Sequence, residues 1–132
     1  MRYLLDTHSL LWSLLDPQKL SKKARSAVLD SENTVAVSAV TFWEISLKFA
    51  LGKLELTELL PEDLPAVAQE TGLDIIPLDV SEAASFHRLP RLTHKDPFDR
   101  LIVWQAIQRK LVLICADREF QNYQEHGLRV LW

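Results

Sequence analysis

The chain has a single cysteine, Cys115, among its 132 residues. One thiol cannot form an internal disulfide or supply a cysteine-rich zinc site, and its isolation fits a reducing cytoplasm. The chain also lacks an apolar run of about 20 residues, the length that a bilayer-spanning helix needs. An N-terminal signal pattern is absent as well. We therefore expect a cytoplasmic protein that does not enter a membrane.

Positive charge is slightly outnumbered, with 15 Lys and Arg against 18 Asp and Glu. The formal net charge of −3 argues against a generally basic nucleic-acid-binding protein. The negative charge is compatible with a nuclease in which metal ions bridge an acidic site and the phosphate. The 48% hydrophobic and 25% charged fractions are typical of a soluble globular protein. Because no repeat, low-complexity segment or linker interrupts the chain, we expect one domain over residues 1–132.

Short apolar or β-branched runs alternate with helical patterns. We expect strands at residues 2–5, 34–38, 73–77, 111–116 and 128–131. We expect helices at residues 7–15, 41–51, 61–70, 81–89, 96–111 and 118–125, and another that begins at Leu20-Ser21. This alternation predicts right-handed crossovers and an α/β fold, with a mostly parallel sheet and helices on both faces.

The segment Asp96-Pro97-Phe98-Asp99 opens a long helix. Pro97 suits the first helical position, Asp96 is then the natural N-cap, and Asp99 falls at N3. Capping alone would explain both acids, because carboxylates are stabilised at the positive end of a helix. Asp96 could also pair with Arg100.

Acidic residues recur where the predicted elements meet. Asp6 and Asp117 follow strands, Glu44 lies in the first turn of a helix, and Asp99 starts the helix before a buried strand. Since ligands of open α/β sheets bind outside the carboxyl ends of the strands, these four carboxylates should converge. The alternative for each is local: Asp6 and Asp117 could cap helices, and Glu44 could pair with Lys48.

Converging carboxylates have a chemical consequence. Like charges held close together repel, and their pKa values rise unless cations are present. A site with oxygen ligands only indicates Mg²⁺ or Mn²⁺ rather than zinc. Such sites perform phosphoryl chemistry, in which a metal activates water and steadies the leaving oxygen.

Four segments that span nearly the whole chain resemble the PIN-domain family, and most closely its VapC-type toxins of type II toxin–antitoxin pairs. They are Leu-Leu-Asp-Thr-His at 4–8, Val-Ser-Ala-Val-Thr-Phe-Trp-Glu-Ile at 37–45, His-Lys-Asp-Pro-Phe-Asp-Arg-Leu-Ile at 94–102, and Leu-Ile-Cys-Ala-Asp at 113–117. The resemblance implies a three-layer α/β/α PIN-like fold with a mostly parallel central sheet of four to five strands.

The resemblance also implies an activity. It is that of a Mg²⁺-dependent endoribonuclease toxin, which hydrolyses RNA phosphodiester bonds with metal-activated water. The implied partners are a VapB-like antitoxin and a second copy of the chain in a homodimer. The positions that match the acidic, catalytic and metal-binding residues of the family are Asp6, Glu44, Asp99 and Asp117, with Asp6 and Asp99 as the main metal ligands. Where Cys115 stands, VapC-like sequences often have Thr or Ser, so a hydroxyl contribution is lost there.

Basic residues precede and follow the Asp96 cap. Arg91, His94, Lys95 and Arg100 could bind RNA phosphates beside the metals, or they could belong to a solvated loop.

Other functions remain open at this stage. A metal-independent ribonuclease would use histidines as acid and base, and His8 and His94 lie near the acidic edge. A receiver-like domain would need paired acids after the first strand and a lysine after a late one. Here Thr7-His8 follows Asp6, and the late strand ends in Asp117. The same sequence, Asp6-Thr7-His8, lacks the Asp-x-Asp of haloacid-dehalogenase-like phosphatases. A non-catalytic binding domain on a similar fold is a further alternative.

Several apolar helix residues are candidates for an interface. Leu10, Leu11, Leu14 and Phe49 could become buried in a homodimer or against an antitoxin segment. The alternative is that all of them belong to the core.

Overall fold

The computed structural model describes residues 1–132 and centres on a five-stranded sheet. Its strands are β1 (Arg2–Leu5), β2 (Thr34–Ser38), β3 (Asp74–Ile76), β4 (Val112–Ile114) and β5 (Arg129–Leu131). Their spatial order is β3-β2-β1-β4-β5, and every neighbouring pair is parallel. The predicted parallel sheet is confirmed, and the carboxyl ends of its strands meet at one edge.

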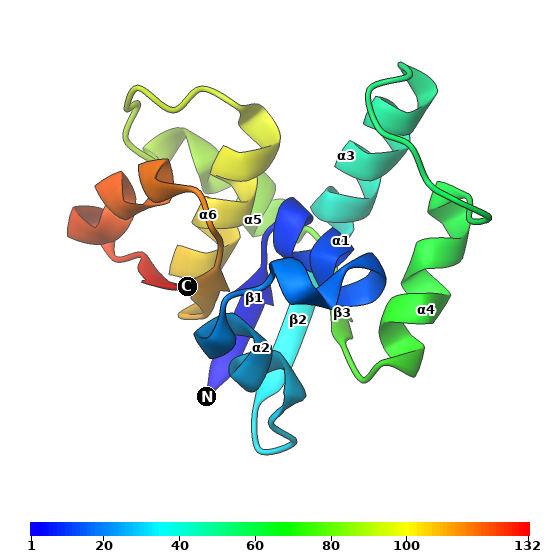
Figure 1. Ribbon diagram of the computed structural model, residues 1–132. Helices are drawn as coiled ribbons and strands as arrows, with labels where there is room; N and C mark the ends of the chain where they lie inside the picture. Colours follow the sequence, from blue (N-terminus) through cyan, green and yellow to red (C-terminus); the bar gives the residue numbers. More distant parts are fainter.

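Helical segments connect the strands (Figure 1). The α-helices are α1 (Thr7–Leu15), α2 (Lys22–Leu29), α3 (Ala39–Ala50), α4 (Leu64–Glu70), α5 (Val80–Ser85) and α6 (Pro97–Arg109). The 3₁₀ segments are η1 (Pro17–Lys19), η2 (Pro61–Asp63), η3 (Phe86–Arg88) and η4 (Arg118–His126). None of the helices combines the length and apolar character that a bilayer crossing requires.

Alternate strand residues contribute to two separate cores. Tyr3 and Leu5 of β1 pack with residues of α1, α2 and α4 on one face. Leu4 packs with residues of α6 and η4 on the other. Figure 1 shows α1 and α2 on the near side of the sheet. Since successive strand residues point to opposite faces, this arrangement gives the expected three layers, helices–sheet–helices.

Local chemistry explains where several predicted boundaries are wrong. α3 begins at Ala39 rather than Thr41, because the Ser38 hydroxyl accepts a hydrogen bond from the N–H of Val40 at 3.0 Å and caps the helix earlier. The prediction that Glu44 lies in the first turn is therefore wrong, and Glu44 falls in the second turn of α3. The helices predicted at residues 61–70, 81–89 and 118–125 are partly or wholly 3₁₀. Such tighter turns are common where a helical segment is short.

The apolar residues proposed for an interface differ in burial. Leu10 is fully buried and belongs to the core that also contains β1 and β4 residues, so for Leu10 the alternative of a core position is confirmed. Leu11 and Leu14 are half-buried against the same core. Phe49 is also half-buried.

Candidate active site

Asp6 follows β1 directly and caps α1. Its Oδ1 accepts a hydrogen bond from the N–H of Ser9 at 2.9 Å, and its own N–H donates to the carbonyl of Ile114 in β4 at 3.2 Å. The residue is buried, and burial raises its carboxyl pKa, which the hydrogen bonds from Ser9 lower in part and the charge of Glu44 raises further. The predicted cap is confirmed, and it uses only one of the two carboxylate oxygens.

The start of α6 presents two acids in different roles. Asp96 Oδ1 accepts hydrogen bonds from the N–H groups of Phe98 at 2.9 Å and Asp99 at 3.2 Å, so Asp96 is the N-cap and Pro97 is the first helical residue. The carboxylate of Asp99 instead contacts His94, whose Nε2 lies 3.2 Å from Oδ2. Capping therefore accounts for Asp96 but leaves the side chain of Asp99 facing the site.

Glu44 is a buried carboxylate on α3 that has a partner for each oxygen. Thr7, at the start of α1, donates its hydroxyl to Oε1 at 2.5 Å, and Lys48 donates its ammonium group to Oε2. The predicted pairing of Glu44 with Lys48 is therefore confirmed. It does not remove Glu44 from the site, because carboxylate oxygens of Glu44, Asp96 and Asp99 all lie within 4.8 Å of one another.

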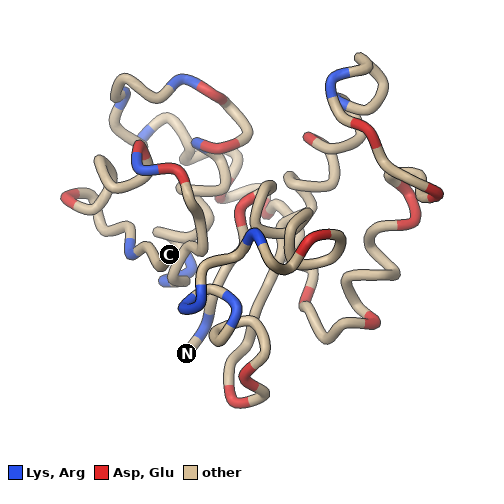
Figure 2. The backbone as a smooth tube through the Cα atoms, viewed as in Figure 1, with Lys and Arg blue, Asp and Glu red and all other residues tan.

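We call Asp6, Glu44, Asp96 and Asp99 the acidic cluster. Burial raises the pKa of Asp99 to about 7, with contributions in the same direction from the charges of Asp96, Glu44 and Asp6 and an opposing one from His94. Burial alone would lower the pKa of Lys48, but its hydrogen bond to Glu44 and the charges of Glu44, Asp96 and Asp99 raise it. Figure 2 shows acidic segments from several elements around the upper end of the central strands.

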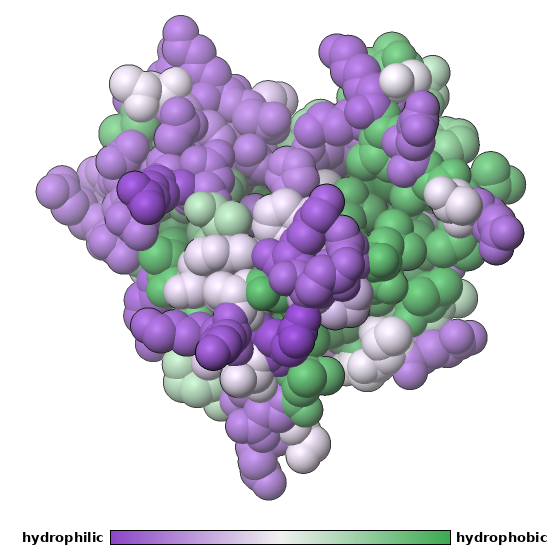
Figure 3. Space-filling view, in the orientation of Figure 1, coloured by the Kyte–Doolittle hydropathy of each residue, from purple (hydrophilic) through white to green (hydrophobic).

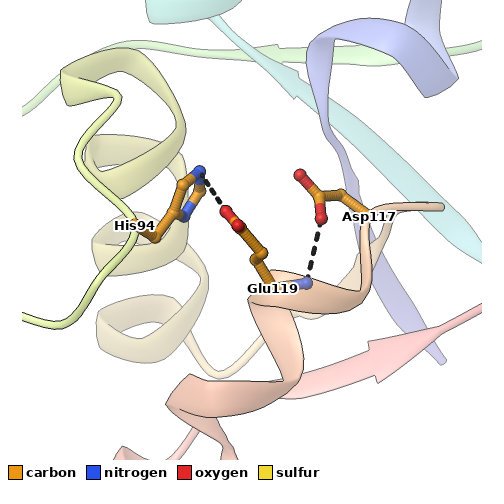
Figure 4. Close-up of side chains that lie close together, drawn as sticks. All are labelled: His94, Asp117 and Glu119. Atoms are coloured by element: carbon orange, nitrogen blue, oxygen red, sulfur yellow. Dashed lines mark hydrogen bonds and ion pairs between the residues drawn. The ribbon is translucent and has the colours of Figure 1, made fainter.

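Asp117 lies beside this cluster, next to His94. It caps η4 by accepting a hydrogen bond from the N–H of Glu119 at 2.9 Å. Ligand atoms of His94, Asp117 and Glu119 lie within 4.8 Å of one another, and Figure 4 shows the three side chains converging from the loop before α6 and the start of η4. His94 Nε2, 3.2 Å from Asp99 and 4.0 Å from Glu119, connects this group to the acidic cluster.

The family model of the PIN domain matches residues 3–125 of this chain. This chain belongs to the PIN domain family. The match covers nearly the whole chain and all the acids described above, so the resemblance expected from the sequence is confirmed.

Individual PIN-domain relatives extend the comparison. Ribonuclease VapC22 of Mycobacterium tuberculosis is 27% identical over 129 residues, which cover 98% of this chain and 97% of that protein. The DNA-bound VapBC structure from Salmonella typhimurium matches with a TM-score of 0.69 and 21% identity, covering 99% of this chain and 97% of that chain. The structure of VapBC2 from Rickettsia felis, bound to a DNA fragment from its promoter, matches with a TM-score of 0.68 and 17% identity. The match covers 99% of this chain and 98% of that chain. At these identities the two structures establish a shared fold.

The basic residues around the PIN-domain site separate into two groups. His94 is buried, and its ring lies edge-on to Phe120 at 5.1 Å, so it faces the acids rather than open solvent. The Arg100 guanidinium donates hydrogen bonds to the carbonyls of Leu89 and Pro90, each at 3.2 Å, and the predicted pair with Asp96 is not formed. The side chains that remain exposed are those of Arg91 and Lys95.

Sequence reasoning missed the contact between Thr7 and Glu44. Thr7 was not recognised as a partner of Glu44, 37 residues away; its place directly after Asp6 was the one available signal.

Cys115 is buried, and burial together with the charges of Asp6, Asp117 and Asp99 raises the pKa of its thiol. The thiol therefore stays protonated beside the acids.

Proposed function

We propose that this PIN domain is a divalent-metal-dependent endoribonuclease and the toxin of a toxin–antitoxin pair. One observation carries the proposal: the carboxylates of Glu44 on α3 and of Asp96 and Asp99 at the start of α6 converge, and burial together with their charges and that of Asp6 raises the pKa of Asp99 to about 7. The similarity to a protein named as a ribonuclease, along nearly the full length of both chains, supports the same reading.

The donor set fits Mg²⁺ or Mn²⁺. Asp6 and Asp99 would be the main ligands, with Glu44 and Asp117 completing the site, and all four offer hard oxygen donors. Burial, and after it the charges of Asp96, Glu44 and Asp6, raise the pKa of Asp99, and a bound divalent cation would favour its charged form. When bound, the ion would lower the pKa of a coordinated water and counter charge on the phosphate.

Neighbouring residues would hold the ligands in place. Asp96 fixes the start of α6 and therefore the position of Asp99 three residues later. His94 contacts Oδ2 of Asp99 at 3.2 Å and would restrict its carboxylate to one orientation.

Exposed basic residues would contact the RNA backbone. Arg91 and Lys95 line an open groove of about 750 Å³ together with Gln121, Asn122 and one acid, Glu125. Two cations and two amides are suited to phosphate and ribose contacts. His94 and Arg100, which the sequence placed in the same group, would support the site from within, because both are directed at protein atoms.

The proposed partner is a VapB-like antitoxin, in a cytoplasmic assembly with a toxin homodimer. In the view of Figure 3, hydrophobic residues are concentrated on the right of the molecule, where α1 and α4 lie. Leu15 and Leu60 are about half exposed, at 47% and 51%, and Leu11 and Leu14 are partly exposed. An antitoxin segment that covered them would bury apolar surface that a soluble monomer leaves in water.

The proposal is tested by expressing the chain in bacteria with and without its neighbouring reading frame. Expression alone should arrest growth and fragment cellular RNA, and co-expression of a cognate antitoxin should restore both. Asp6→Asn, which removes one ligand charge and keeps the side-chain shape, should be harmless in the same vector. Equal growth with the parent chain and with Asp6→Asn, at matched protein levels, would contradict the toxin assignment.

A further inference from the structure

Lys48 contacts the acidic cluster from α3, on a different element from His94. Its ammonium group is hydrogen-bonded to Oε2 of Glu44, one helical turn earlier on α3. The carboxylates of Asp96 and Asp99 are also close enough for their charges to act on it. Lys48 therefore places a fixed positive charge among the proposed metal ligands.

Two hydrogen bonds fix the carboxylate of Glu44, which in turn positions Lys48. Its Oε1 accepts the hydroxyl of Thr7 at 2.5 Å, and its Oε2 accepts the ammonium group, so each oxygen has a protein partner. Only 3% of the Glu44 side chain is exposed, whereas 33% of the Lys48 side chain is. The carboxylate is thus held inside the protein, while the lysine that it binds keeps a third of its side chain exposed.

Other cations nearby do not occupy this position. The guanidinium of Arg100 is bonded to the carbonyls of Leu89 and Pro90 and lies over the ring of Phe86. Arg91 and Lys95 line the groove formed with residues of η4. A phosphate bound against the acidic cluster on the α3 side would meet the ammonium group of Lys48.

We propose that Lys48 is a catalytic residue that contacts the scissile phosphate, and that Glu44 and Thr7 are its positioning residues. The proposal rests on the proposed ribonuclease function. In the reaction a water molecule loses a proton to solvent as its oxygen forms a bond to phosphorus. The bond between phosphorus and the ribose 3′ oxygen breaks, and solvent water protonates the departing oxygen. Lys48 keeps its proton throughout and donates a hydrogen bond to the phosphate oxygen on which negative charge grows. A preorganised donor of this kind is worth on the order of 100-fold in rate.

The test compares Lys48→Met with Lys48→Arg by two readouts: kcat and KM for RNA cleavage at saturating Mg²⁺, and Mg²⁺ affinity from calorimetry without RNA. We expect Lys48→Met to lower kcat on the order of 100-fold. The same variant should bind Mg²⁺ at least as tightly as the parent, because it removes a cation from among the carboxylates. Lys48→Arg should recover most of the loss in kcat. Lys53→Met, an exposed change beyond the end of α3, should match the parent in both readouts.

Each contrary outcome is distinct. Unchanged kcat with tighter Mg²⁺ binding would show that Lys48 is only a counter-ion, and would overturn the proposal. Parallel loss of Mg²⁺ binding and kcat would show a merely structural role and would overturn it too. If Lys48→Met does not fold, Lys48→Gln, whose amide can still donate to Glu44, takes its place with the same expectations. Failure of the proposed function itself would appear in the parent, as absent Mg²⁺ binding or absent cleavage.

Discussion

Replacing Asp99 by asparagine is expected to lower RNA cleavage by at least about 100-fold and to abolish the response of the protein to Mg²⁺. Asp99 contributes both charge and a carboxylate oxygen to the acidic cluster, and an amide is a weak substitute for either. Thermal unfolding with and without Mg²⁺ should therefore show a metal-dependent rise in Tm for the parent and little for the variant. Glu58→Gln, at an exposed position in the loop after α3, is the matched control and should behave as the parent.

The same substitution should change metal-free stability with a pH dependence of definite sign. The pKa of Asp99 is about 7 in the folded protein against an ordinary 3.8, so the folded state binds the proton more tightly than the unfolded state. The resulting contribution to stability is present at low pH and is lost as pH rises from about 4 to about 7. In EDTA, Asp99→Asn should therefore gain stability relative to the parent between pH 5 and pH 8. A variant that is instead less stable by up to about 1 kcal/mol at pH 8, and still active, would return Asp99 to a purely helix-capping role.

The largest stability effect away from the site is expected from Arg109→Met. The Arg109 guanidinium donates to Oε2 of the buried Glu82 at 2.8 Å and to the carbonyl of Pro77 at 2.9 Å. Burial alone would raise the pKa of Glu82, but hydrogen bonds from Arg109, the N–H of Asp79 and the amide of Gln105 hold it below its usual value. Removing Arg109 leaves a buried carboxylate without its cation, and we expect a loss of about 3 kcal/mol in the free energy of unfolding.

Two further variants make that prediction specific. Arg88→Met, an exposed arginine in η3, should change the free energy of unfolding by no more than about 0.5 kcal/mol. The double variant Glu82→Gln/Arg109→Met should recover part of the loss, because its glutamine carries no charge to leave unpaired. Denaturant unfolding measures all three. A loss below about 1 kcal/mol for Arg109→Met, or no recovery in the double variant, would show that solvent screens this pair.

How much could be predicted from the sequence differs between the fold and the site. The β-branched run Thr34–Ser38 and the apolar runs before Asp6 and Asp117 predicted parallel strands, and the strand-end rule then predicted that the acids converge. Local patterns could not show that a histidine in a basic loop is buried. His94 is covered by Phe120 and Tyr123, which reach it from η4, and such packing between distant segments leaves no periodic signal.

The two partners of Glu44 show the same limit of prediction from local sequence patterns. Its pairing with Lys48 follows from the i,i+4 helical spacing, which predicted it. The contact with Thr7, on a different helix, depends on how α1 and α3 lie side by side and was not foreseen. The local rule thus identified one contact, while the tertiary arrangement turned that contact into part of a buried site.

Cleavage of a defined RNA in Mg²⁺ and in EDTA, followed by analysis of the new ends, tests the metal-dependent mechanism most directly. In the proposed mechanism a bound metal would activate the attacking water and the 3′ oxygen would depart, so products should carry 5′-phosphate and 3′-hydroxyl ends, and EDTA should stop the reaction until Mg²⁺ or Mn²⁺ is restored. Cleavage that persists in EDTA and yields cyclic-phosphate ends would contradict this, because the 2′-hydroxyl of the RNA would then be the nucleophile and His94 or His8 the proton carrier.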